Sequence, residues 1–422
     1  MTTFPSKFAP LLDSLRSVAP RRGPQFDLIT RNRSALGQDD RLPPLVPRLV
    51  IPMQDRTDEV EEYNSHFDKG QFLSRQENWT ELGRLIRESD KARSATPGGV
   101  PVSRVLAAGA RHDAVQAAVD EVEAQNERGA RASIDALTEV NEEYPDDHGV
   151  AMAVSLAHVD IAWAWRGEGH WHQLPTVNKG AFYAHFRAAA RILDDFDAFE
   201  LDAPSLASVR CTLLPAERRP DLRVADDFED LIDLDPECPL HMRDLGVNLL
   251  PDWYGSYERL EIEANRTASR TADIWGTGGY ALTYLDALLI DDAAFDAVEP
   301  EFFVSGMRDI LERRPTQHIA NLLAAFCGRI TAPRAPKHDV RSYIAQSMRW
   351  ILTGYLREVH PLVWMETPGL QMQPDPLPED REAQKRGRVR ALSVLTEHFA
   401  LEIRQGNRIV FDDSGVRISP AH

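Results

Sequence analysis

Three stretches of this chain repeat one local layout, in which a helical segment runs into a proline and a largely apolar helix follows. The aligned prolines are Pro145, Pro236 and Pro315, and they lie 91 and 79 residues apart. Each spacing is close to two helical-hairpin repeats, whose usual length is ~34–47 residues. The pattern therefore predicts a stack of antiparallel helix pairs, a fold that presents a surface. The three stretches cover residues 135–165, 228–251 and 307–330.

The rest of the sequence divides the chain into three parts. Residues 1–58 are rich in proline and arginine, and adjacent prolines there forbid regular structure, so we expect an irregular arm. Residues 59–366 form the expected helical-repeat domain, an all-α solenoid of antiparallel helix pairs. Residues 367–422 begin as a proline-rich linker, continue as a helix and end in alternating apolar and polar residues around an Asp-Ser-Gly turn. That ending predicts a small β-hairpin.

The composition limits the classes of partner. Acidic residues outnumber basic ones by 66 to 48, which gives a formal net charge of −18. Such a surface repels nucleic acids and anionic lipids, so we expect neither as a partner. The longest apolar run is too short to span a membrane, and no secretory signal is visible. The cysteines, Cys211, Cys238 and Cys327, are far apart, which predicts neither disulfides nor a cysteine-based zinc site and favours the cytoplasm.

Two turns within residues 135–293 carry a family resemblance. The first turn covers residues 162–167 and fits Ala-Trp-x-x-Arg-Gly, and the second covers residues 250–256 and fits Leu-Pro-x-Trp-Gly-Gly-Ser at all positions but one. These turns resemble those of an uncharacterised bacterial family of tetratricopeptide-like proteins, known as a domain of unknown function. Tyr254 stands where the second pattern has glycine. The resemblance implies a tetratricopeptide-like α-solenoid and no activity. The matching residues are Ala162, Trp163, Arg166, Gly167, Leu250, Pro251, Trp253, Gly255 and Ser256.

Aromatic side chains concentrate in the middle third of the chain. Tryptophan and tyrosine, together with arginine, are the usual anchors of binding surfaces, although at helical spacing they also fill helix–helix cores. Trp253 and Tyr254 lie in a turn bounded by proline and glycine, so we expect these two side chains to reach solvent. The residues we expect to bind a partner are Trp165, Arg166, Trp253, Tyr254 and Tyr257.

Metal-ligating residue types occur together in one loop. Glu168, His170 and His172 are types that bind zinc or iron. In a loop, however, a His-x-His spacing does not direct both rings to one point, so the sequence favours a turn over a metal site, and no cofactor is expected. The three histidines of the proline-marked stretches are expected to be polar core or helix-end residues rather than catalysts: His158, His241 and His318.

Two aspartates are embedded in apolar sequence. Asp160 and Asp286 are flanked by aromatic and aliphatic residues, which predicts burial. A buried carboxylate without a partner is costly, so each is expected to form a structural ion pair. Arg166 and Arg270 are the candidate partners.

These observations favour a cytoplasmic helical-repeat protein that binds a peptide or protein partner, as a scaffold or adaptor without catalysis. One alternative is a metal-dependent or other enzyme that uses the loop of Glu168, His170 and His172. Another is a structural subunit of a larger assembly, because the arm and the hairpin tail could each add to a neighbour. The sequence leaves the partner and the oligomeric state open.

Overall fold

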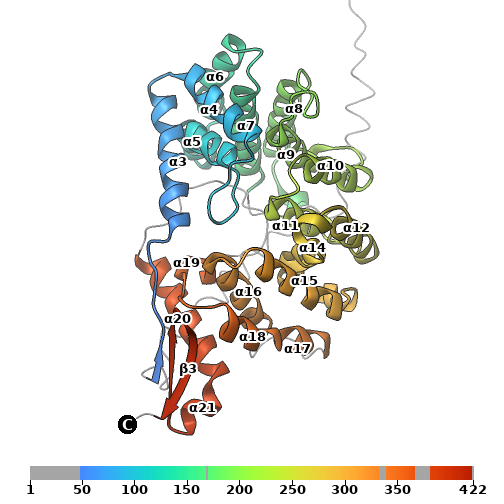
Figure 1. The fold of residues 1–422 in the computed structure, drawn as a ribbon. Helices are drawn as coiled ribbons and strands as arrows, with labels where there is room; N and C mark the ends of the chain where they lie inside the picture. Colours follow the sequence, from blue (N-terminus) through green and yellow to red (C-terminus); the bar gives the residue numbers. More distant parts are fainter. Residues whose placement is uncertain (1–47, 168–169, 332–338, 366–380, 421–422) are drawn as a thin grey trace, which may run out of the picture.

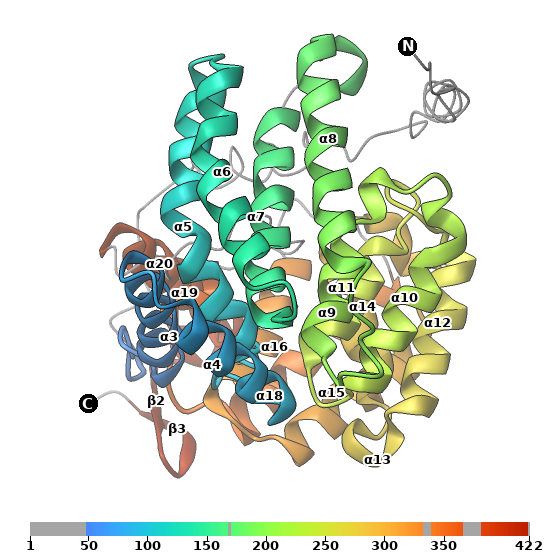
Figure 2. The same cartoon turned by 90° about the horizontal axis from the view of Figure 1, so that it is seen from above.

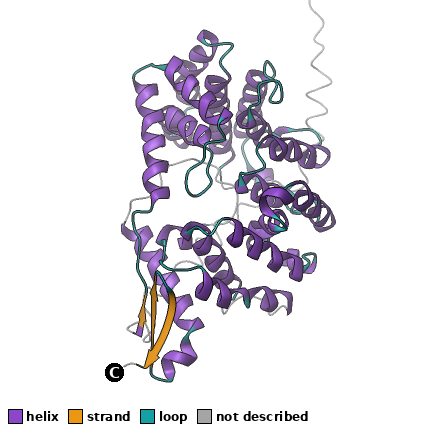
Figure 3. Cartoon of the chain, viewed as in Figure 1, coloured by secondary structure: helices purple, strands orange, loops and turns teal. Residues whose placement is uncertain are grey.

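The computed structural model describes residues 48–167, 170–331, 339–365 and 381–420. Helices dominate this part of the chain, and a small sheet stands at one end (Figures 1 and 3). Most of the expected N-terminal arm and of the expected linker lies outside the described residues, as does Glu168. No helix within these ranges has the length and apolar character needed to cross a membrane.

The helices follow one another around an arc, from α3 through α12 to α16 (Figure 1). The first part contains α3 (Asp58–Arg75), α4 (Trp79–Lys91), α5 (Val102–Glu123), α6 (Glu127–Glu143), α7 (His148–Arg166), η2 (Trp171–Gln173), α8 (Thr176–Leu193), α9 (Pro204–Thr212), η3 (Leu214–Ala216) and α10 (Pro220–Leu234). The second part contains α11 (Pro239–Asn248), α12 (Tyr257–Arg270), α13 (Ala272–Trp275), α14 (Gly278–Ile290), η4 (Asp292–Asp296), α15 (Pro300–Arg313), α16 (Gln317–Ile330), α17 (Asp339–Ala345), α18 (Ser347–Gly354), α19 (Pro361–Met365), α20 (Arg381–His398) and α21 (Ala400–Arg404). Figure 2 shows α5, α6, α7 and α8 standing side by side.

Each aligned proline forms a corner between two helices, as the sequence predicts. The corners join α6 to α7, α10 to α11 and α15 to α16. The residue before each proline ends its helix with similar backbone angles, because the proline ring clashes with a helical conformation at that position. These residues are Tyr144 (φ −122°, ψ 57°), Asp235 (φ −140°, ψ 74°) and Arg314 (φ −136°, ψ 74°). One steric rule thus creates three similar corners.

The two ends of the described chain meet in one sheet. Strand β2 (Asn407–Asp412) pairs antiparallel with β3 (Gly415–Pro420), which confirms the expected hairpin. Strand β1 (Leu49–Val50) adds to the other edge of β2 in parallel, so the strand order is β1-β2-β3. Next to this sheet, Asp55, which lies between β1 and α3, forms an ion pair with Arg388 of α20. The sequence did not predict that the start of the helical region would be fixed to the C-terminal segment.

Both embedded aspartates are buried and form ion pairs, as expected. Asp160 on α7 accepts from Arg111 on α5, with 2.7 Å between Oδ2 and Nε, and both side chains are at most 5% exposed. Asp286 on α14 accepts two hydrogen bonds of 3.0 Å from Arg243 on α11. These pairs connect helices that are not consecutive in the sequence.

The partners named from the sequence are wrong. Arg166 is buried at the end of α7, where its Nη1 donates to the carbonyl oxygen of Gly167. Arg270 on α12 forms ion pairs with Glu229 and Asp233 on α10, and those groups are partly exposed. Each arginine was expected as the partner because it lies near an embedded aspartate in the sequence. The packing of α7 on α5 instead brings Arg111 to Asp160, and the packing of α11 on α14 brings Arg243 to Asp286.

We predict that Asp160→Ala lowers the free energy of unfolding by about 3–5 kcal/mol, because it leaves the buried Arg111 guanidinium without its carboxylate. Urea unfolding measures the change. Asp113→Ala, which removes the partly exposed pair with Arg75, is the control and should have little effect. Equal losses of unfolding free energy in Asp160→Ala and Asp113→Ala would show that the buried pair stabilises the protein no more than the exposed one. The double variant Arg111→Met, Asp160→Leu should recover part of the loss.

Candidate functional site

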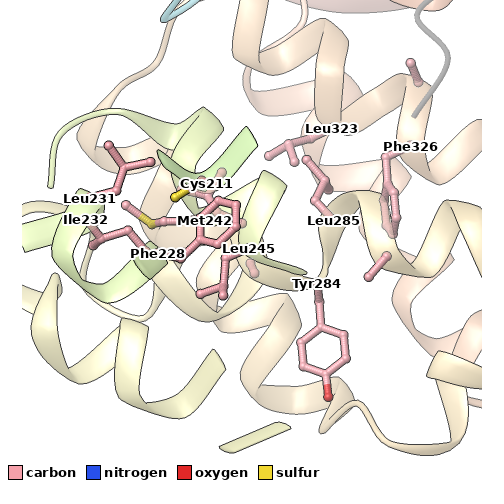
Figure 4. Close-up of a cluster of buried hydrophobic side chains, with 14 of the residues drawn as sticks. Cys211, Phe228, Leu231, Ile232, Met242, Leu245, Tyr284, Leu285, Leu323 and Phe326 are labelled. Atoms are coloured by element: carbon pink, nitrogen blue, oxygen red, sulfur yellow. The ribbon is translucent and has the colours of Figure 1, made fainter. Parts of the chain in front are cut away.

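Two groups of residues with possible functions flank helix α11. Aromatic residues follow its C-terminal end, and metal-ligating residue types lie at its N-terminal end. The helix itself is firmly placed, because Met242 and Leu245 pack with Phe228 and Leu231 of α10 in the core (Figure 4). On another side, α11 lies so close to α14 that a Cβ atom at Gly246 would stand 1.7 Å from the carbonyl oxygen of Thr283. Only glycine permits this approach. The two ends of α11 are therefore held in fixed positions.

The turn after α11 contains three of the residues expected to bind a partner. The turn folds back on the helix, since the amide of Tyr254 donates to the carbonyl oxygen of Asn248 (3.1 Å). A Cβ atom at Gly255 would lie 2.2 Å from the carbonyl oxygen of Leu249, so this position also requires glycine. Trp253 and Tyr257 are half-buried. These contacts hold the turn against α11, and both aromatic residues stay partly exposed.

The prediction that Tyr254 reaches solvent is wrong. Its side chain is 9% exposed, and its ring packs at 73° to that of Trp253, with 6.0 Å between centroids. Burial raises the pKa of the Tyr254 hydroxyl. Because the backbone doubles back on α11, the ring that follows Trp253 points into the protein rather than out of it. The turn thus offers Trp253 and Tyr257 to a partner, and not Tyr254.

Three carboxylates lie near the Tyr257 hydroxyl at this turn. The Tyr257 hydroxyl donates to Asp291 Oδ2 over 2.6 Å. Burial, this hydrogen bond and the charges of Asp252 and Asp296 raise the pKa of Tyr257. We call Asp252, Trp253, Tyr257, Asp291 and Asp296 the acidic aromatic turn. It combines ring faces with negative charge, which is an environment that attracts cations.

The remaining expected binding residues do not lie at the surface. Trp165 and Arg166, at the end of α7, are 2% and 3% exposed. Trp165 belongs to the main core, and burial lowers the pKa of Arg166. Their positions follow from the packing of α7, whose residues are buried on nearly every side. They take no part in the acidic aromatic turn.

The expected metal-binding loop is only partly described. His170 and His172 are exposed, and their rings stack at 19° with 5.6 Å between centroids. Glu168 lies outside the described residues. Among the residues that the structure describes, no third histidine, cysteine or carboxylate completes a metal-binding group with these two rings.

A different group of metal-ligating residues lies at the other end of α11. Asp235, Cys238 and His241 each offer one ligand atom, and these atoms all lie within 4.8 Å of one another. All three side chains are buried, with exposed fractions of 7%, 4% and 4%. No other such group of three occurs in the described ranges. This group was not predicted, because Cys238 is far from the other cysteines in the sequence and His241 was expected to be a polar core or helix-end residue.

The local fold explains why these three residues meet. Asp235 ends α10 before Pro236, Cys238 is the N-cap of α11, and His241 lies in its first turn. Residues three apart share a helix face, which brings Cys238 and His241 together, and the proline corner turns Asp235 toward them. Burial alone would lower the pKa of His241, but Cys238 and Asp235 outweigh it and raise the pKa. The signal in the sequence was the Asp-x-x-Cys-x-x-His spacing across the proline.

Comparison with known proteins gives no relative from which a function could be transferred. A scan against family models finds no match, and searches of curated proteins and of solved structures find none. The tetratricopeptide-like resemblance of residues 135–293 therefore stays a prediction. Any function has to be argued from the residues of this chain.

One further pair of histidines, the buried His158 and the partly buried His185, links α7 to α8. The Nδ1 atoms of His158 and His185 lie 3.0 Å apart. Burial lowers the pKa of His158 to about 3 and that of His185 to about 4, and the charges of Arg191 and Arg131 act in the same direction. Both rings are therefore neutral at pH 7, and the nearby arginines make a bound cation unfavourable at this pair.

We predict that the protein loses stability as the pH falls below about 6.5. An unfolded histidine has an ordinary pKa of about 6.5, so the unfolded chain takes up protons first and the free energy of unfolding declines. His158→Gln should reduce this decline by at most about 1.4 kcal/mol per pH unit. Urea unfolding between pH 7 and pH 5 measures it, with the exposed His170→Gln as control. If the free energy of unfolding falls as steeply with pH in His158→Gln as in the unaltered protein, His158 does not contribute to the pH dependence.

Proposed function

We propose that this chain is a cytoplasmic, tetratricopeptide-like helical scaffold that binds a protein partner through a segment rich in arginine or lysine. The observation that carries the proposal is the acidic aromatic turn, where Trp253 and Tyr257 are partly exposed beside carboxylates. The arc of paired helices supports a scaffold role because such folds present extended surfaces.

The chemistry of the turn favours a cationic ligand. A guanidinium or ammonium group over a tryptophan face gains about 0.5–2 kcal/mol, more where water is excluded. Carboxylates such as Asp291 add charge-assisted hydrogen bonds to the same group. The net charge of −18 also speeds the approach of a basic segment. An acidic or purely apolar segment would gain neither the cation–π contact, nor the charge-assisted hydrogen bonds, nor the electrostatic attraction.

The rigidity of the turn supports affinity as well. Gly255 lets the turn fold closely onto the end of α11, and the side chain of Ser256 caps α12 by accepting a hydrogen bond from the amide of Arg259. A site that is already ordered loses little conformational entropy when a ligand binds. The rings of Trp253 and Tyr257 are thus held ready for contact.

We predict that fluorescein-labelled nona-arginine binds the full chain and that Trp253→Ala weakens this binding about tenfold, which corresponds to ~1.4 kcal/mol. Asp291→Asn, which keeps an acceptor for the Tyr257 hydroxyl, should also weaken it. Fluorescence anisotropy measures the affinities, and added salt should lower them all.

The control is Trp171→Ala, which removes a tryptophan that is also half-buried but lies in η2. It should bind the peptide like the unaltered protein. Unchanged affinity in Trp253→Ala, or an equal loss in Trp171→Ala, would mean that the overall acidic charge binds the peptide and that the turn does not.

A further inference from the structure

We infer that Asp235, Cys238 and His241 bind one divalent transition-metal ion, and that Zn²⁺ suits this donor set best. A thiolate, an imidazole and a carboxylate are the three ligand types that zinc takes in proteins. Magnesium and calcium prefer sites made of oxygen ligands, so a sulfur and a nitrogen among three donors disfavour them. This inference does not depend on the proposed partner binding.

The distances agree with a shared ion. With bonds of about 2.0–2.3 Å to a tetrahedral zinc, neighbouring ligand atoms lie about 3.3–3.6 Å apart. His241 Nε2 and Asp235 Oδ2 are 3.5 Å apart. All three ligand atoms lie within 4.8 Å of one another, so only small side-chain rotations separate the group from metal-binding geometry.

The imidazole of His241 supplies an independent observation. Its Nε2 is buried in a side chain that is only 4% exposed, and it forms no hydrogen bond of ordinary geometry, because the Asp235 oxygen beside it stays 3.5 Å away. Leaving a buried polar atom unsatisfied costs about 1–3 kcal/mol. A metal ion between the ring, the thiolate and the carboxylate would satisfy this atom and balance the negative charge of the other two.

The same arrangement argues against a catalytic Cys-His-Asp triad. In a triad, the nucleophile and the carboxylate contact opposite nitrogens of the imidazole. Here one ring nitrogen of His241 lies within 4.8 Å of both the Cys238 sulfur and an Asp235 oxygen. The burial of all three side chains also keeps a substrate away from the sulfur. Convergence of three donors on one point is the geometry of metal binding.

The other two proline corners serve as an internal comparison. Relative to its proline, each corner has matching positions one residue before, two after and five after. The corners have similar backbone angles before the proline, and the first two also place the N-cap of the next helix two residues after it, but only the middle one carries metal-ligating types at all three positions. The equivalents are Tyr144, Asp147 and Val150 in the first corner and Arg314, Gln317 and Ala320 in the third. The corner therefore does not require Asp, Cys and His in order to form.

The surroundings make this a structural site. The loop of residues 94–101 covers it, and Cys238 Sγ lies 3.6 Å from the carbonyl oxygen of Gly99. Gly99 has φ +86°, and a Cβ atom there would lie 3.1 Å from the Pro239 ring, so glycine allows the loop to lie this close. From the other side, Trp275 Nε1 donates to the carbonyl oxygen of Pro236 over 2.9 Å. An ion here would fix a junction between the early and the later helices.

The test uses the full chain, stripped with a chelator and then titrated with Zn²⁺ or Co²⁺. We expect one equivalent of Zn²⁺ per chain by elemental analysis, a thiolate-to-cobalt charge-transfer band with Co²⁺, and a thermal midpoint that rises with Zn²⁺ concentration. Cys238→Ser should lose the band, and His241→Gln and Asp235→Asn should lose stoichiometric binding. Cys327→Ser, which alters another buried cysteine, should behave like the unaltered protein.

Two results would overturn the inference. One is an unaltered protein that takes up no stoichiometric Zn²⁺ and shows no charge-transfer band. The other is Cys238→Ser or His241→Gln that keeps both signals. Far-UV circular dichroism checks that each variant is folded, and Asp235→Asn, which preserves size, tests the site if the others lose helicity. Fast alkylation of Cys238 in a protein that binds no metal would instead indicate a reactive thiol.

Discussion

The conflict between a proline ring and a helical conformation at the preceding residue shapes this protein more than any other single constraint. It ends α6, α10 and α15 with similar backbone angles, so the chain changes direction before each following helix. The corner at Pro236 has a second consequence. It takes Asp235 out of α10 and places its carboxylate beside the first turn of α11, where Cys238 and His241 share a face. The proposed metal site thus depends on the same steric rule as the fold.

The helix pairs could be predicted because their causes are local. A proline acts on its immediate neighbour, and the apolar spacing within each segment sets the buried face. The C-terminal hairpin also has local signals, in its alternation and its turn. Strand β1 is different: it has two residues, and its pairing with Ile409 and Val410 spans most of the chain. Nothing within such a short segment specifies a partner so far away in sequence.

The residues of the candidate sites also divide into those whose environment could be predicted from nearby sequence and those whose environment depends on tertiary packing. The need of Asp160 for a cation follows from its apolar neighbours, but the choice of Arg111, 49 residues earlier, follows only from the packing of α7 on α5. The burial of Tyr254 depends on how the backbone after α11 folds back. The group of Asp235, Cys238 and His241 could have been predicted from the Asp-x-x-Cys-x-x-His spacing, because the proline corner and the first turn of α11 bring the three residues together locally. Paired cysteines do not signal such a group, because a zinc site with a single cysteine lacks that pattern.

Helix α11 carries the proposed metal site at one end and the acidic aromatic turn at the other. Its ten residues rise about 15 Å, so the two sites do not touch. Coupling between them would require an element with two stable arrangements that both ligands bias differently. The contact at Gly246, where α11 meets the backbone of α14, allows little movement of the helix. An ion at Asp235, Cys238 and His241 would therefore stabilise the corner without altering the turn, and the two proposed sites would act separately.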